Sequence, residues 1–155
     1  IPTLREVLDL VHEELGLVAE IKEPGTEAII ASVIIDRMPE RLFMVSSNPE
    51  SVAMAKRLLP EAQAGLIYSG ATDDPIGLAR SVQADVILPR WDRVSREVVE
   101  QAHGAGLLVI PWTLNREADI KEAARLGVDG FASDDPCAAR RYLQGGAKKS
   151  PTPAR

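Results

Sequence analysis

Glu20 and Lys22 are the two residues whose types and spacing most directly suggest chemistry. They stand two positions apart in residues 17–22, an apolar run typical of a strand, and side chains at i and i+2 of a strand share a face. A carboxylate is a preferred oxygen ligand of divalent cations, and an ammonium group can balance phosphate charge. A buried charge is costly unless it is paired or metal-bound. The pair is therefore either a structural ion pair or part of a site for a metal and an anionic substrate.

Further polar side chains follow the later apolar runs. Ser46 ends one run, Trp112 and Asn115 follow another, and Asp134 and Asp135 follow the last. In α/β proteins, sites are built at the carboxyl ends of parallel strands. We expect Trp112 and Asn115 to form a pocket wall rather than plain core, whereas Ser46 is open between a phosphate contact and ordinary strand-end polarity. Asp135 precedes a proline and is expected to cap the last helix.

The histidines and the cysteine lie away from these positions. His12 falls outside the apolar stripe of its expected helix, and His103 falls at a helix end, where a cationic side chain suits the helix dipole. Cys137 starts a helix, and no neighbouring residue type indicates a nucleophile. We expect both histidines to be structural or solvent-facing, so neither is a candidate general base.

Alternating strands and helices must position these residues. The strands are expected as continuous apolar runs, which is typical of parallel strands buried on both faces: residues 17–22, 42–45, 65–68, 85–88, 107–110 and 130–132. The intervening amphipathic segments predict helices over residues 4–15, 27–38, 50–59, 75–82, 95–104, 117–126 and 136–143. Six βα units indicate an α/β fold, either doubly wound or about three quarters of a (β/α)₈ TIM barrel.

The composition limits the class of protein. Of the 155 residues, 45% are hydrophobic and 26% are charged, as in an ordinary globular domain. A net charge of −5 argues against a nucleic-acid partner. No apolar run approaches the roughly 18 residues that cross a bilayer, so no transmembrane segment is expected. A single cysteine excludes an internal disulfide and a cysteine-rich zinc site, and it favours a cytoplasmic location.

Five motifs occur in an order and spacing that resemble one enzyme family. They are Ile1–Leu8 (IPTLREVL), Ala19–Lys22 (AEIK), Val45–Glu50 (VSSNPE), Trp112–Asn115 (WTLN) and Gly127–Pro136 (GVDGFASDDP). Each motif alone is weak, but together, over residues 1 to about 143, they are similar to the glycerophosphodiester phosphodiesterases.

The resemblance implies a TIM barrel that hydrolyses glycerophosphodiesters to glycerol 3-phosphate and an alcohol with a divalent metal, Mg²⁺ or Ca²⁺. It implies that Glu20 is a metal ligand and that Lys22, Ser46, Trp112 and Asn115 bind substrate. The family's two catalytic histidines and its other carboxylate ligands belong to motifs that precede the first helix and do not occur here. The metal site is therefore expected to be incomplete, and this chain alone is expected to be inactive.

Several alternatives stay open at this point. Thr3 and Glu6 predict a capping box at the very start of the chain, so we expect a fragment or processed product of a longer protein. Residues 1–144 are expected to form the C-terminal part of the barrel, and residues 145–155 a flexible tail. A second copy of the chain or a missing N-terminal segment is expected to complete the barrel. The competing function is a non-catalytic truncated barrel that binds a ligand or oligomerises; the ordered motifs disfavour an unrelated phosphate-handling barrel.

Overall fold

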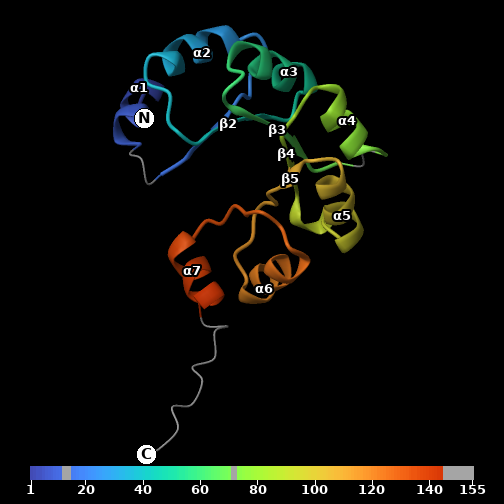
Figure 1. Cartoon of the computed structure of the whole chain (residues 1–155). Coiled ribbons are helices and arrows are strands. Elements are labelled where there is room, and N and C mark those ends of the chain that lie inside the picture. Colours follow the sequence, from blue (N-terminus) through green and yellow to red (C-terminus); the bar gives the residue numbers. More distant parts are fainter. Residues whose placement is uncertain (12–14, 71–72, 145–155) are drawn as a thin grey trace, which may run out of the picture.

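Strands and helices alternate along the chain as the apolar runs predict (Figure 1). The computed structural model describes residues 1–11, 15–70 and 73–144, so the interpretations of His12 and of residues 145–155 lie outside the described residues. The strands are β1 (Leu17–Glu20), β2 (Leu42–Ser46), β3 (Gln63–Tyr68), β4 (Val86–Pro89) and β5 (Leu108–Val109). The helices are α1 (Leu4–Leu10), α2 (Glu27–Ile35), α3 (Pro49–Leu58), α4 (Pro75–Ser81), α5 (Arg96–Gly104), α6 (Glu117–Leu126) and α7 (Pro136–Gln144), with a 3₁₀ turn, η1, at Trp91–Arg93.

The five strands form one parallel sheet in which every strand pairs with its neighbours in sequence, in the order β1-β2-β3-β4-β5. Glu20 lies opposite Val45, and Ile67 lies opposite Leu88. The sheet curves, with helices α2 to α5 along its outer side (Figure 1). A doubly wound sheet reverses its strand order at a switch point, whereas a barrel adds strands in sequence. The chain therefore has the fold of part of a (β/α)₈ barrel.

The sixth expected strand is not a regular strand. Residues 130–132 have no strand assignment, although the segment still runs beside β5 and its continuation. Asp129 N donates to Val109 O at 3.0 Å, Ala132 N donates to Pro111 O at 2.9 Å, and Leu114 N donates to Ala132 O at 2.8 Å. Proline has no backbone N–H, so the ladder cannot continue regularly through Pro111. This also explains why β5 is shorter than expected.

Both faces of the sheet are apolar. Because side chains alternate along a strand, neighbouring residues pack into different clusters. Met44 packs with α2 and α3 on the outer side, whereas Val45 packs with Val86 and Leu88 on the inner side. Leu66 belongs to the cluster beneath α4 and α5. The continuous apolar runs of the sequence thus reflect burial on two sides, as expected for parallel strands.

Several helix ends have clear local causes. The predicted capping box is present, because Thr3 N donates to the Glu6 carboxylate at 2.7 Å and Glu6 N donates to Thr3 Oγ1 at 3.3 Å. Asp135 caps α7, as expected, through Ala138 N at 2.8 Å. The helix expected to reach Met38 ends at Ile35, in keeping with the restriction that a following proline places on Met38. Each described helix is too short or too polar to span a lipid bilayer.

Gly65 occupies a point on the inner face of β3 where no side chain fits. A Cβ atom added there would lie 2.7 Å from Leu88 Cδ1 and 2.8 Å from both Val45 Cγ1 and Val86 Cγ1. We expect Gly65→Ala to lower the free energy of unfolding by about 1–3 kcal/mol, because overpacking forces neighbours off their rotamers. Urea unfolding measures this. Gly104→Ala, where a Cβ meets nothing within 4 Å, is the matched control. Equal stability of the two variants would contradict the packing argument.

Candidate functional site

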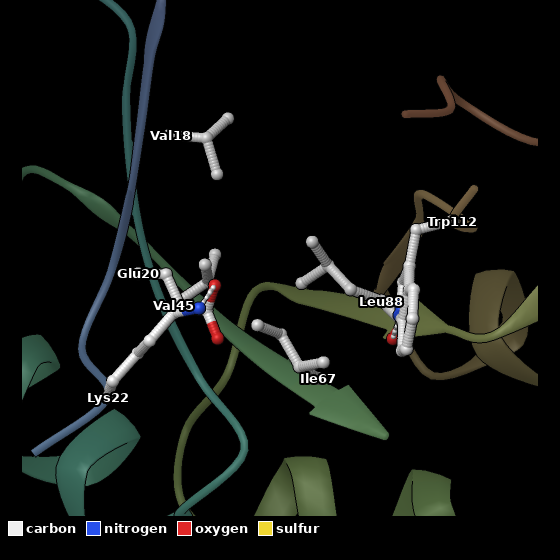
Figure 2. Close-up of a pocket in the computed structure, with 7 residues that line it drawn as sticks. All are labelled: Val18, Glu20, Lys22, Val45, Ile67, Leu88 and Trp112. Carbon is white, nitrogen blue, oxygen red and sulfur yellow. Dashed lines mark hydrogen bonds and ion pairs between the residues drawn. The ribbon is translucent and has the colours of Figure 1, made fainter. Parts of the chain in front are cut away.

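A cavity of about 430 Å³ lies on the inner side of the curved sheet. Strands β1 to β4 contribute to its wall, together with Lys22 after β1 and Trp112 after β5. The lining residues are Val18, Glu20, Lys22, Val45, Ile67, Leu88 and Trp112. Figure 2 shows Glu20 and Lys22 on one side, Leu88 and Trp112 on the other, and Ile67 between them. The cavity therefore has a charged end and an apolar wall.

Glu20 and Lys22 form the charged end. Lys22 Nζ lies 3.6 Å from Glu20 Oε2, and the side chains are 76% and 43% exposed for Lys22 and Glu20 respectively. The sequence suggested buried charges, and this is wrong: β1 ends at Glu20, Lys22 lies beyond it, and no described residue covers the inner face of β1. An exposed ion pair of this kind contributes little to stability, so both groups are available to a ligand.

Trp112 forms the apolar end with its ring. Its indole N–H donates to Leu88 O at 2.9 Å, and its backbone N–H donates to Pro89 O at 3.0 Å. Trp91 N in turn donates to Trp112 O at 2.8 Å. Because the indole donor is already engaged, Trp112 presents a hydrocarbon surface to the cavity. The position at a strand end predicted this pocket wall correctly.

The structure does not bring Ser46 to the cavity. Ser46 is 1% exposed, its hydroxyl donates to Ile21 O at 2.7 Å, and Asn48 N donates to that hydroxyl at 3.1 Å. Since Val45 faces the cavity, the next residue faces the helix layer. The hydroxyl therefore ties the end of β1 to the end of β2 and is not free for a phosphate.

Asn115 also lies outside the cavity wall. Its Nδ2 donates to Asp134 Oδ2 at 2.7 Å, and its Oδ1 accepts from Asp134 N at 2.9 Å and from Ser133 Oγ at 3.2 Å. These bonds join the loop after β5 to the loop before α7. Asn115 thus holds two loops together. It does not line the cavity that Glu20 and Lys22 line.

No histidine lines the cavity among the described residues. His103 Nε2 lies 2.9 Å from Asp129 Oδ2, and this oxygen also accepts from Val109 N at 2.8 Å, so His103 is structural, as expected. Within the same described ranges, no cluster of three or more His, Cys, Asp or Glu side chains could hold a metal ion. Glu20 alone amounts to one oxygen ligand.

The sequence reasoning missed Glu27, the first residue of α2. This carboxylate is 7% exposed; Ser51 Oγ donates to its Oε1 at 2.5 Å, and Gly25 N donates to its Oε2 at 2.8 Å. The hydrogen bond from Ser51 holds the pKa of Glu27 below its usual value, with a smaller contribution from the Gly25 N–H, against the opposing effect of burial. The only signal in the sequence is a carboxylate at the start of a mostly apolar helix, EAIIASVII.

The sequence of this chain is similar to the sequences of one enzyme family. The model of the glycerophosphoryl diester phosphodiesterase family matches residues 1–138. The chain is 32% identical to a glycerophosphodiester phosphodiesterase of Caldanaerobacter subterraneus subsp. tengcongensis over 88% of this chain, and 27% identical to one of Bacillus altitudinis, also over 88%. It spans 59% and 60% of the lengths of these two relatives.

Solved structures show the same fold. A phosphodiesterase of Oleispira antarctica, solved in complex with the product sn-glycerol-3-phosphate, superimposes with a TM-score of 0.82 at 22% identity. The match covers 92% of this chain and 61% of that one. At this identity the likeness shows the fold alone.

The lowered pKa of Glu27 predicts a pH-dependent contribution to stability. Because the folded-state pKa lies below the unfolded value of about 4.5, the carboxylate stabilises the fold above that pH and loses this effect as pH falls through the folded pKa. We expect Glu27→Gln to lower the melting temperature clearly at neutral pH and progressively less as the pH falls below 4.5. Thermal melts across this range measure it, with Glu100→Gln, an exposed site on α5, as control. A pH-independent difference would contradict the assignment.

Proposed function

The chain belongs to the glycerophosphoryl diester phosphodiesterase family, and on that premise we propose that it forms the substrate-binding part of a hydrolase that converts glycerophosphodiesters to glycerol 3-phosphate and an alcohol. The observation that carries the proposal is the cavity that joins Glu20 and Lys22 to an apolar wall ending at Trp112. A glycerophosphodiester combines an anionic phosphate with a glycerol group, whose C–H surface suits the apolar wall while its hydroxyl groups face away from it.

The charged end of the cavity suits the phosphate. In hydrolysis, the oxygen of water adds to phosphorus and gives up a proton, the bond from phosphorus to the alcohol oxygen breaks, and the alcohol oxygen takes up a proton. Negative charge increases on the non-bridging oxygens during this change, and a nearby cation stabilises it. Lys22 supplies such a cation, because its ammonium group lines the cavity and contacts only Glu20, at 3.6 Å, among the described residues.

A divalent metal fits Glu20 only in part. Its carboxylate lies at the cavity and offers a hard oxygen ligand, but calcium and magnesium take about six ligands or more. We propose that Glu20 contributes one ligand and that the others come from outside the described residues. A bound divalent cation would help to neutralise phosphate charge. Since no described histidine lines the cavity, we assign binding and charge stabilisation, and not proton transfer, to Glu20 and Lys22.

We propose that this reaction takes place in the cytoplasm. Cys137 is a free, exposed thiol, which suits a reducing compartment. Detection of the protein in cytosolic rather than extracellular fractions would agree with it.

A carboxylate-to-amide change at Glu20 tests the leading proposal. We expect Glu20→Gln in the complete protein to lower kcat/KM for glycerophosphodiesters by about a hundredfold or more, because a charged group acting on the transition state is lost. Release of glycerol 3-phosphate from a panel of diesters measures this. Glu23→Gln, which alters an exposed glutamate in the loop that follows β1, is the matched control and should keep full activity. Full activity of Glu20→Gln would reject the assignment.

A second candidate function, a binding module that assembles through β1, has one observation in its favour. β1 comes first in the sheet order, no other described strand pairs with its outer edge, and Val18 on it is 58% exposed. Unpaired strand edges invite pairing with another chain.

Light scattering on residues 1–155 tests this second candidate. Pairing through β1 predicts a particle of at least twice 16.8 kDa, and predicts that Val18→Lys, which places a charge on the strand, restores the monomer. A monodisperse monomer for the unaltered chain would reject edge pairing and leave the hydrolase proposal in place.

A further inference from the structure

A buried carboxylate connects the first two βα loops. Glu27 at the start of α2 accepts the Ser51 hydroxyl of α3 at 2.5 Å, although the two residues lie 24 positions apart. Both are nearly inaccessible, at 7% and 1% exposed. The carboxylate also lies at the first turn of α2 and beside the first turn of α3, where helix dipoles favour negative charge. The ionised form is therefore held firmly in one place.

This carboxylate holds the loop that carries Lys22. Its second oxygen accepts Gly25 N at 2.8 Å, and Gly25 has a φ of +90°, a conformation that side-chain-bearing residues rarely adopt. At the other end of the loop, the Ser46 hydroxyl donates to Ile21 O at 2.7 Å. The segment from Ile21 to Gly25 is thus held at one end by Ser46 of the next unit and at the other end by Glu27 of its own unit.

Lys22 has no comparable anchor of its own. Its side chain is 76% exposed, and the 3.6 Å contact with Glu20 is too long for a hydrogen bond. The position of its ammonium group therefore depends on the backbone from which it extends. Small displacements of a charged group away from a reacting phosphate cost much of its effect.

We propose that Glu27 is a positioning residue, which acts through the backbone of residues 21–25 to hold Lys22 at the cavity for a phosphate group. The inference rests on the proposed function, because it assumes that Lys22 meets the phosphate. Ser46 and Ser51 take part in the same arrangement: Ser46 bonds Ile21 O at one end of that backbone, and Ser51 holds the carboxylate that bonds Gly25 N at the other end. Glu27 itself does not line the cavity and does not touch the substrate.

A second carboxylate, Asp85, lies at the amino ends of the strands and serves to distinguish positioning of Lys22 from ordinary stabilisation of the fold. Asp85 accepts Lys56 Nζ at 2.9 and 2.7 Å and Ala64 N at 2.8 Å, so it too bonds a side chain of α3 and a backbone N–H. It precedes β4, at the amino ends of the strands, away from Lys22. Asp85→Asn is therefore a control that weakens the fold without touching the loop of Lys22.

The test is a double-mutant cycle between Glu27 and Lys22 in the complete protein, with release of glycerol 3-phosphate as readout. We expect Glu27→Ala to lower kcat/KM by about tenfold to a hundredfold in the wild-type background. In the Lys22→Met background the same change is expected to cost less than about twofold, because residues that act through one another are not additive. Asp85→Asn should lower the melting temperature while kcat/KM stays within about twofold.

Two further variants keep the test decisive. Glu27→Gln retains the volume and one acceptor oxygen, so it should recover part of the activity lost in Glu27→Ala. Ser51→Ala leaves the carboxylate in place and removes one of its hydrogen bonds, so it should lower kcat/KM less than Glu27→Ala does. This variant replaces Glu27→Ala in the test if Glu27→Ala does not fold. Unchanged kcat/KM in Glu27→Ala, or a loss that persists in full beside Lys22→Met, would overturn the proposal.

Hydrogen exchange distinguishes failure of this inference from failure of the proposed function. An unaltered protein that releases no glycerol 3-phosphate from any diester would reject the function. Glu27→Ala should still speed exchange of the amides of Ile21 and Gly25, which donate to Val45 O and to the Glu27 carboxylate, and Asp85→Asn should not. Unchanged exchange of these amides in Glu27→Ala would overturn the positioning role, whatever the activity.

Discussion

Alternation of side chains along the parallel strands decides where each residue of this protein acts. In β2, Met44 packs beneath the helices while Val45 faces the cavity, and the sheet register places Val45 opposite Glu20 of β1. A shift of one residue would exchange the two faces. Met44 and Val45 pack into different clusters, so a shift would disrupt both, and this packing favours the register that brings Glu20 and Trp112 to one cavity.

The sequence alone predicts much of this arrangement, because it depends on local patterns. Continuous apolar runs predicted the order of strands and helices, and the strand ends predicted that Glu20, Lys22 and Trp112 would lie together. The same reasoning failed for Ser46, since a position at a strand end does not determine which face the side chain takes. The face that Ser46 takes can be assigned only once Val45 is known to face the cavity.

Other features depend on distant partners and could not be predicted from local patterns. Glu27 reads as an ordinary helix-starting glutamate until Ser51 is folded against it. The charges of Glu20 and Lys22 looked buried because they belong to an apolar run, yet the exposure of β1 depends on what covers its inner face. The loss of regular pairing after β5 is a partial exception, because Pro111 itself carries the signal.

Neighbour-only strand pairing also bears on how the chain folds. Paired residues such as Ala19 with Met44, or Gly65 with Val86, lie about 20–25 positions apart along the chain. Only a short loop has to close before each new strand is stabilised, so the entropic cost of each step is small and similar. Such a sheet can grow one unit at a time while the polypeptide emerges from the ribosome, with every new strand meeting a template that is already in place.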